Sequence, residues 1–208
     1  VYFNDVSSDK VESGVLSTSS DLANKMLHII RHARKPVILA GQGCNDAAKE
    51  LKEFAEALQI PVATTLHALG TFDERNDLAL NMVGMHGHPT PNFMFQEADL
   101  IISIGSRFDD RITGRISDYI PAARQAAEEG RGGVIHVDIR RTEHGKQIKP
   151  TYFVHSTGKK FLQNMNQGLA QADIKVITDS WVERMKELQA EYPIKIPEFA
   201  TQQVTMEK

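Results

Sequence analysis

Short apolar segments alternate with amphipathic segments along most of the chain. Residues 37–40 (VILA) and 100–102 (LII) carry no polar side chain. Strands that are apolar on both faces belong to parallel sheets, because helices cover both sides of such a sheet. Strand and helix patterns that alternate with short connections predict an α/β fold. We therefore expect an open, parallel, six-stranded Rossmann-like sheet with helices on both faces.

The same pattern places most of the elements. Five of the strands are predicted at residues 37–40, 61–65, 99–104, 133–138 and 151–154. Helices are predicted at residues 20–34, 45–58, 89–98, 122–129, 158–171 and 178–191. Ser20 and Asp21 are good N-caps for the first helix, and Asn45 or Asp46 is expected to cap the second.

Length and charge narrow the class of protein. A chain of 208 residues suits one domain with tails: a tail or linker at 1–19, a folded unit at 20–172, and a helical linker with a tail at 173–208. The 24 Lys and Arg residues and the 27 Asp and Glu residues are spread along the chain, so nucleic-acid binding is not expected. No apolar run approaches the ~20 residues that a membrane span needs, so no membrane partner is expected either.

The start of the chain and its single cysteine bear on its origin. The sequence begins at Val1 without a signal-like segment, and we expect it to be a piece of a longer protein. Cys44 cannot form an internal disulfide, which favours a reducing, intracellular compartment. We interpret Cys44 as a small buried side chain.

Ligands of open parallel sheets bind beyond the carboxyl ends of the strands, and two such ends carry suggestive residues. At Gly41-Gln42-Gly43, glycines let the backbone approach a phosphate, and the following helix start offers free N–H groups. A tight strand-to-helix turn explains the same residues. At Thr64 and Thr65, hydroxyls can bond a diphosphate or a ribose, although threonines are common at strand ends. Neither motif decides the function alone.

A histidine-containing loop follows at residues 84–88 (GMHGH). His86 and His88 could ligate a metal, but no Cys, Asp or Glu lies at a supporting spacing, so no metal site is predicted. The flanking glycines indicate a flexible loop that brings its backbone and Met85 against a flat ligand. A solvent-facing loop with incidental histidines fits equally well.

The most informative strand end is residues 105–111 (GSRFDDR), which follow the most apolar strand. Arginine pairs bidentately with phosphate or carboxylate, and a neighbouring aspartate can orient the guanidinium. A surface ion-pair network is the competing interpretation, but it does not need this position, so we favour a binding role. Asp138, at another strand end, can accept hydrogen bonds from an adenosine ribose or can simply cap the next helix.

Several of these segments together resemble the central domain of acetohydroxyacid (acetolactate) synthases, over about residues 20–192. The matching segments are GQG at 41–43, IPVATTL at 60–66, LG at 69–70, GMHG at 84–87, DLII at 99–102 and GSRFDDRITG at 105–114. The EGRGG segment at 129–133 is most similar to the fungal catalytic subunit.

The resemblance implies a cofactor and a set of site residues. Enzymes of this family depend on thiamine diphosphate and have three domains, of which the central one binds FAD without a net redox role. The flavin site would be lined by Gly41, Gln42, Gly43, Thr64, Leu66, Gly84, Met85, His86, Gly105, Arg107, Asp109, Asp138 and Ile139. Met85, Asp110 and Arg111 would face the substrate channel, where the arginine would hold the carboxylate of a 2-ketoacid.

Two departures from the family pattern stand out. The family usually carries Gly-Asp-Ala after the last strand, where the aspartate helps to hold the adenine end of FAD. This chain has Ser156-Thr157-Gly158 instead. The Gly-Asp-Gly motif that begins the thiamine diphosphate and Mg²⁺ site does not occur in the chain, so catalysis by this chain alone is not expected.

Three hypotheses follow. The first is an FAD-binding central domain of an acetolactate synthase, which would condense pyruvate with a 2-ketoacid on the path to branched-chain amino acids. Its partners would be other domains or subunits of the same enzyme, including a further copy, and a fungal parent would be mitochondrial. The second is a noncatalytic homologue that acts as an interaction module without flavin. The third, ranked lowest, is a nicotinamide- or metal-dependent enzyme that uses Asp138 or the histidines His86 and His88.

Overall fold

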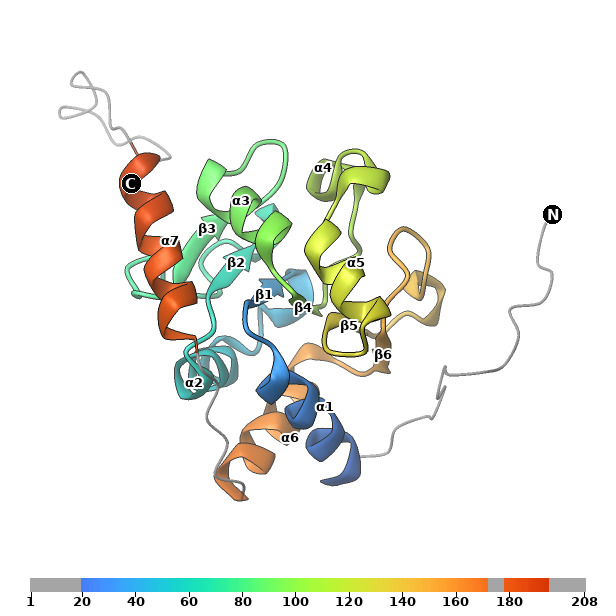
Figure 1. Cartoon of the computed structure of the whole chain (residues 1–208). Helices are drawn as coiled ribbons and strands as arrows, with labels where there is room; N and C mark the ends of the chain where they lie inside the picture. Colours follow the sequence, from blue (N-terminus) through green and yellow to red (C-terminus); the bar gives the residue numbers. More distant parts are fainter. Residues whose placement is uncertain (1–19, 172–177, 195–208) are drawn as a thin grey trace.

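The computed structural model describes residues 20–171 and 178–194 and is built on one parallel sheet (Figure 1). Its six strands pair in the order β3-β2-β1-β4-β5-β6, and every pair is parallel. The strands are β1 (Pro36–Ala40), β2 (Val62–Thr64), β3 (Ala79–Met82), β4 (Leu100–Ile104), β5 (Gly133–Asp138) and β6 (Tyr152–His155). The predicted fold class is therefore confirmed. The strand order runs outward in both directions from β1 and β4, which is the arrangement that opens a crevice between them.

Helices cover both faces of this sheet. They are α1 (Ser20–His32), α2 (Ala48–Leu58), α3 (Pro89–Glu97), α4 (Asp110–Thr113), α5 (Pro121–Glu128), α6 (Gly158–Gln171) and α7 (Asp179–Glu191). Figure 1 shows α1 and α6 on one side of the sheet and α3 and α5 on the other. Alternate residues of β1 face opposite sides of the sheet. Ile38 packs in one core with α1, α2 and α6, whereas Leu39 packs in the other core with α3, α5 and α7. This explains why β1 and β4 are buried at every position and apolar at all but Ser103.

The sixth strand, which the sequence pattern did not place, is β3 at the edge of the sheet. Its first two residues are buried and its last two are partly exposed. Asn81 also has a positive φ of 63°, which is unusual within a strand. Its pairing with β2 also shifts register between Val62 and Ala63. A short, irregular edge strand of this kind leaves no uniform apolar run in the sequence.

The predicted cap of the second helix is wrong. Helix α2 begins at Ala48, its N-cap is Ala47, and no side chain caps it. Asn45 instead ties two loops together, because its amide Nδ2 donates to the carbonyl oxygen of His67 at 3.0 Å and its Oδ1 accepts from the Thr71 hydroxyl at 2.9 Å. A residue that looks like a local cap is thus used for a contact more than 20 positions away.

Helix α7 packs against the sheet unit. Trp181, Met185 and Leu188 are buried, and the indole N–H of Trp181 donates to the carbonyl oxygen of Pro36 at 2.9 Å. The helix lies in the segment expected to be a linker, and its apolar face contributes to the same core as α3 and α5. The tail expected at 1–19 lies outside the described residues, and the division of the chain into domains stays a prediction. Within the described ranges, no helix has the length and apolar character that a membrane crossing requires.

Candidate functional site

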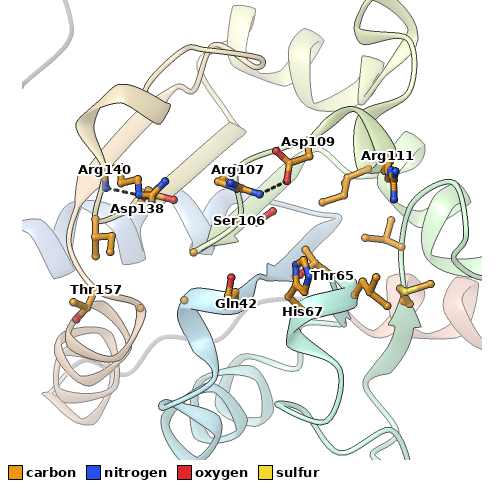
Figure 2. Close-up of a pocket in the computed structure, with 18 of the residues that line it drawn as sticks. Gln42, Thr65, His67, Ser106, Arg107, Asp109, Arg111, Asp138, Arg140 and Thr157 are labelled. Carbon is orange, nitrogen blue, oxygen red and sulfur yellow. Dashed lines mark hydrogen bonds and ion pairs between the residues drawn. The ribbon is translucent and has the colours of Figure 1, made fainter.

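A cavity of about 660 Å³ lies across the carboxyl ends of the strands (Figure 2). Each of the six strands is followed by residues that line it, because parallel strands end at the same edge of the sheet. Figure 2 shows Asp138, Arg140 and Thr157 at one end, Gln42 and Arg107 near the middle, and Thr65, His67 and Arg111 towards the other end. The lining residues are Gln42, Gly43, Asp46, Thr65, Leu66, His67, Met82, Val83, His86, Gly105, Ser106, Arg107, Asp109, Arg111, Ile112, Asp138, Ile139, Arg140, Ser156, Thr157 and Gly158.

Glycines bring three strand-end loops into backbone contact at this cavity. The Gly41 N–H donates to the Ile104 carbonyl at 2.9 Å, and the Gly43 N–H donates to the Gly105 carbonyl at 3.2 Å. A Cβ atom at Gly43 would lie only 2.8 Å from the Cα of Gly105, and one at Gly158 would collide with the Gly43 carbonyl oxygen. The glycines are therefore needed for the loops to meet, and they leave a floor without side chains.

The arginine-aspartate loop after β4 is held by a buried aromatic ring. Phe108 is buried and has a positive φ of 53°, so it points into the core and turns its neighbours towards the cavity. The Arg107 guanidinium pairs with the Asp109 carboxylate at 2.9 Å, and both side chains are about half exposed. Arg111 lines the other end of the cavity. Asp110 lies outside the lining, and its Oδ1 accepts the Arg111 backbone N–H at 3.0 Å.

A buried histidine is hydrogen-bonded to the same loop. His136 on β5 is 1% exposed, and its Nε2 lies 2.8 Å from the carbonyl oxygen of Ser106. Burial lowers the pKa of His136 below its usual 6.5, and the hydrogen bond to Ser106 opposes this shift only in part. The ring is therefore neutral at pH 7. The Ser106 hydroxyl is also buried, and no described residue serves as its hydrogen-bond partner.

The loop between β3 and α3 is anchored at several points. The Asn92 side chain accepts the Gly84 N–H at 2.9 Å and donates to the carbonyl oxygens of Gly84 and His88 at 3.0 and 3.1 Å. The Met85 N–H donates to the Arg111 carbonyl at 2.7 Å. Side-chain and backbone hydrogen bonds thus join this segment to α3 and to Arg111, and the flexibility expected from its glycines stays a prediction.

The two histidines of this loop have different surroundings. His86 lines the cavity, whereas His88 is the N-cap of α3 and accepts the Thr90 N–H at 3.4 Å. Met85 is 70% exposed and is not among the residues that line the cavity. Across residues 20–171 and 178–194, no three His, Cys, Asp or Glu side chains are grouped so that they could hold a metal ion.

The opposite end of the cavity contains a buried acid beside two hydroxyls. Asp138 is 6% exposed, and its Oδ1 accepts the Arg140 backbone N–H at 2.7 Å. The Thr157 hydroxyl accepts the Lys160 N–H at 3.2 Å at the start of α6, and the Ser156 hydroxyl donates to the Thr157 carbonyl at 3.1 Å. Asp138 thus braces a local turn and also faces the cavity. The alternative that it caps the next helix is wrong, because the short helix at Arg141–Glu143 has Arg140 as its N-cap and no side chain caps it.

The structure brings together ten of the residues that the sequence singled out. Gln42, Gly43, Leu66, His86, Gly105, Arg107, Asp109, Arg111, Asp138 and Ile139 line the cavity. Gly41, Thr64, Gly84, Met85 and Asp110 do not line it: Gly41 packs under the Gly105 loop, Thr64 is buried, and Gly84 packs on the Arg111 carbonyl. Whether any of them binds flavin or substrate stays a prediction.

Other lining residues are not in the flavin and substrate sets that the resemblance implies, although Thr65 is considered above for its hydroxyl. They are Asp46, Thr65, His67, Met82, Val83, Ser106, Ile112, Arg140, Ser156, Thr157 and Gly158. Thr65, Ser106 and Arg140 come within two residues of a strand end, and that position is a usable signal. His67 and Asp46 reach the cavity from a short turn and the segment before α2, and no local pattern marks them.

Comparison with known proteins agrees with this arrangement. Residues 23–165 match the family model described as "Thiamine pyrophosphate enzyme, central domain". The chain is 39% identical over 173 residues to the mitochondrial acetolactate synthase of Schizosaccharomyces pombe, covering 82% of this chain and 26% of that protein. It is 39% identical over 173 residues to the mitochondrial acetolactate synthase catalytic subunit of Saccharomyces cerevisiae, covering 82% and 25%. With the chloroplastic acetolactate synthase 1 of Zea mays, identity is 35% over 178 residues, covering 85% and 26%.

These matches confirm the resemblance inferred from the motifs. The chain spans about a quarter of the length of the three relatives. The matched family region includes all six strands, and so every loop that lines the cavity. The chain therefore belongs to the family of thiamine pyrophosphate enzyme central domains, and it is homologous to acetolactate synthases.

Proposed function

We propose that this chain is the FAD-binding central domain of an acetolactate synthase. The observation that carries the proposal is a single cavity that crosses all six strand ends, with an acidic end at Asp138 and an arginine end at Arg111. A dinucleotide is a long ligand with chemically different ends, and the crevice of a doubly wound sheet is its usual site.

The residues present fit a flavin dinucleotide. The volume of about 660 Å³ lies within the range of roughly 300–1,000 Å³ that is typical of cofactor and small-molecule sites. The glycine floor lets a diphosphate approach the backbone, and Arg107 uses one N–H towards Asp109, so its other donors can reach a phosphate. Asp138 offers a carboxylate to a ribose hydroxyl. Leu66 and Ile112 offer apolar surface to a flat ring.

Arg111 is proposed to act on the substrate rather than on the cofactor. Its guanidinium lies at the far end from Asp138 and is well suited to a 2-ketoacid carboxylate. In the parent enzyme, thiamine diphosphate with Mg²⁺, bound by other domains, would supply the decarboxylation and carboligation chemistry. This chain would position flavin and substrate, and a parent of the fungal kind would work in mitochondria.

A second candidate function rests on the Ser156-Thr157 segment. Both residues line the Asp138 end, where the family usually has an aspartate for the adenine, and the Thr157 hydroxyl is already used as a helix cap. Loss of a flavin anchor there favours a noncatalytic homologue that serves as an interaction module. The two candidates differ in one measurable property, which is flavin binding.

The test is a flavin titration of the purified chain. FAD is added, the excess is removed, and the visible spectrum is recorded, with affinity taken from flavin fluorescence. We expect one FAD for each chain. Arg107→Ala should weaken binding about tenfold, because it removes a charge-assisted contact.

A matched control is available on the same chain. Arg75 pairs with Asp73 at 2.9 Å, also two positions apart, but it lies outside the cavity lining. Arg75→Ala should therefore leave FAD affinity unchanged. A folded wild-type chain that retains no flavin at any concentration would reject the proposal and favour the interaction module.

A further inference from the structure

One buried hydroxyl in the wall of the cavity has no hydrogen-bond partner. The Ser106 side chain lines the cavity and is 3% exposed, and its Oγ atom is unpaired within residues 20–171 and 178–194. Other buried side-chain atoms of the described chain also lack partners, but their residues lie outside the lining: Thr64, Thr90, Ser103, Tyr119, His136 and Asn166. Ser106 therefore carries an unpaired polar group that a ligand in the cavity can satisfy.

We propose that the Ser106 hydroxyl donates a hydrogen bond to the diphosphate of the bound dinucleotide. This inference rests on the proposed function, which places the diphosphate on the glycine floor within reach of Arg107. Ser106 lies between Gly105 of that floor and Arg107 in the chain, and Figure 2 shows it next to Arg107. A diphosphate oxygen is a charged acceptor, and hydrogen bonds to charged acceptors are stronger than those between neutral groups.

The backbone on which this hydroxyl sits is fixed. The Ser106 carbonyl oxygen lies 2.8 Å from Nε2 of His136, and the Gly105 N–H donates to the Val137 carbonyl at 2.8 Å. The buried Phe108 ring holds the other side of the loop in the core. Ligand binding therefore needs no reordering of this main chain, which lowers the entropic cost of the contact.

The hydroxyl itself can turn towards a ligand. A serine side chain moves between three staggered positions by rotation about one bond. Because the Ser106 Oγ has no partner among the described residues, this rotation breaks no hydrogen bond. A buried hydroxyl without a partner costs free energy, and a ligand that pairs with it removes that cost. The hydroxyl therefore opposes folding in the absence of a ligand and supports binding in its presence.

Ser106→Ala tests this inference with two measurements. The FAD affinity, taken from a flavin fluorescence titration, should fall about tenfold, because a charge-assisted hydrogen bond is lost. The urea midpoint of the chain without flavin should stay the same or rise, because the substitution removes an unpaired buried hydroxyl. A midpoint that falls together with the affinity would show a merely structural role and overturn the inference.

Ser103→Ala is the matched control. Ser103 lies on the preceding strand β4, is fully buried, and also has an unpaired hydroxyl within the described ranges, but it does not line the cavity. Its substitution should leave the FAD affinity unchanged. The visible spectrum of bound flavin adds a test of position. It should be the same in Ser106→Ala and the wild type, because a hydroxyl at the diphosphate does not contact the flavin ring.

The outcomes distinguish this inference from the proposed function. Unchanged FAD affinity in Ser106→Ala would overturn the role of the hydroxyl and leave the flavin proposal standing. Equal losses of affinity in Ser106→Ala and Ser103→Ala would also overturn it, because they would report a general loosening of the sheet. A shifted flavin spectrum in Ser106→Ala would place the hydroxyl at the ring and overturn the diphosphate contact. If the folded wild-type chain binds no FAD, both proposals fail.

Discussion

The Nε2 atom of His136 lies 2.8 Å from the carbonyl oxygen of Ser106, which joins a buried ring on β5 to a loop residue that lines the cavity. Nδ1 is buried without a hydrogen-bond partner among the described residues, so Nε2 carries the proton and donates. The rings of Phe108 and Phe153 both pack edge-on against the His136 imidazole, at centroid distances of 5.2 and 5.5 Å. One imidazole N–H thus helps to hold the loop that carries Arg107, together with buried Phe108 and the backbone bond between Gly43 and Gly105.

Replacing this N–H donor should loosen the loop. His136→Phe keeps a ring of similar size but leaves the Ser106 carbonyl without its donor, and it should lower the free energy of unfolding by about 1–3 kcal/mol. His136→Gln can still donate and should recover much of that loss. Urea denaturation measures both effects. Equal losses in the two variants would show that ring packing, and not the hydrogen bond, is what matters.

Acidification should destabilise the fold between pH 7 and pH 5. Burial lowers the pKa of His136, so the unfolded chain binds a proton before the folded chain does. The stability is therefore complete above pH 6.5 and falls as the pH drops below it, by at most about 1.4 kcal/mol per pH unit for one such group. Asp138 and Glu143 face the ring and reduce the shift, whereas His144 reinforces it.

The same experiment has an internal comparison. Partial burial also lowers the pKa of His88, so it contributes in the same direction. The free energy of unfolding is measured from pH 7.5 to pH 5.5. Its dependence on pH should become weaker in His136→Gln, and the weakening should be smaller in His88→Gln. An unchanged slope in His136→Gln would mean that the acid sensitivity comes from other groups.

Two glycines with similar positive φ values should respond differently to a methyl group. Gly105 and Gly114 have φ values of 64° and 57°. A Cβ at Gly105 would collide with Gly43, whereas a Cβ at Gly114 would meet nothing within 4 Å. Gly114 combines φ 57° with ψ −130°, a conformation that is essentially restricted to glycine, so Gly114→Ala should cost about 1–3 kcal/mol from the backbone alone. Gly105→Ala should cost more than about 3 kcal/mol, because overpacking is added.

Denaturant midpoints of the two alanine variants measure this difference. If Gly105→Ala does not fold, Gly43→Ala provides a milder version of the same test, since its Cβ would lie 2.8 Å from Gly105. Similar costs for Gly105→Ala and Gly114→Ala would show that the loops can move apart, and that close backbone packing does not shape the cavity floor.

The Asn92 side chain should govern the order of the β3–α3 loop. Asn92→Ala removes three hydrogen bonds to Gly84 and His88 and should cost about 2–3 kcal/mol. Hydrogen exchange of the Gly84 backbone amide should become faster in Asn92→Ala as the free energy of unfolding falls. Gln96→Ala on an exposed position of the same helix is the control and should change neither quantity. Slow exchange at Gly84 in Asn92→Ala would show that the backbone bond to Arg111 holds the loop alone.

The sequence predicted what depends on local pattern and missed what depends on distant contacts. The central strands β1 and β4 are apolar at every position but Ser103, so their positions and the parallel sheet follow from composition and period. The ends of such strands then locate the cavity, which is why ten of the expected residues line it. The role of Asn45 could not be read in this way, because its partners His67 and Thr71 are brought near only by the folded chain.

Other misses have the same origin. Asn92 is an ordinary helix residue in the sequence, and its function as a clamp appears only when Gly84 lies beside it. The sequence offers two interpretations of Gly41 and Gly43, a phosphate-binding device or a tight strand-to-helix turn, and it gives no sign that their backbones pack against Gly105. The hydrogen bonds of the loop at 84–88 could not be predicted either, because glycine content reports freedom in the unfolded chain and not the bonds that the fold supplies.

Asp99 should contribute more to stability than its ion pair suggests. Its two carboxylate oxygens accept the backbone N–H groups of Arg34 and Lys35, each at 2.9 Å, just before β1, and Arg131 reaches the same carboxylate at 3.3 Å. Asp99→Ala leaves two backbone donors unpaired at the start of the central strand and should cost about 3 kcal/mol. Arg131→Ala removes only a partly exposed charge and should cost about 1 kcal/mol or less.

Urea denaturation at low and high salt distinguishes these contributions. The loss in Asp99→Ala should change little with salt, because backbone hydrogen bonds in a partly buried setting are weakly screened. The smaller loss in Arg131→Ala should shrink further as salt is added. If both variants lose the same free energy and respond equally to salt, the carboxylate acts mainly through its surface ion pair, and the start of β1 is held by the surrounding apolar core instead.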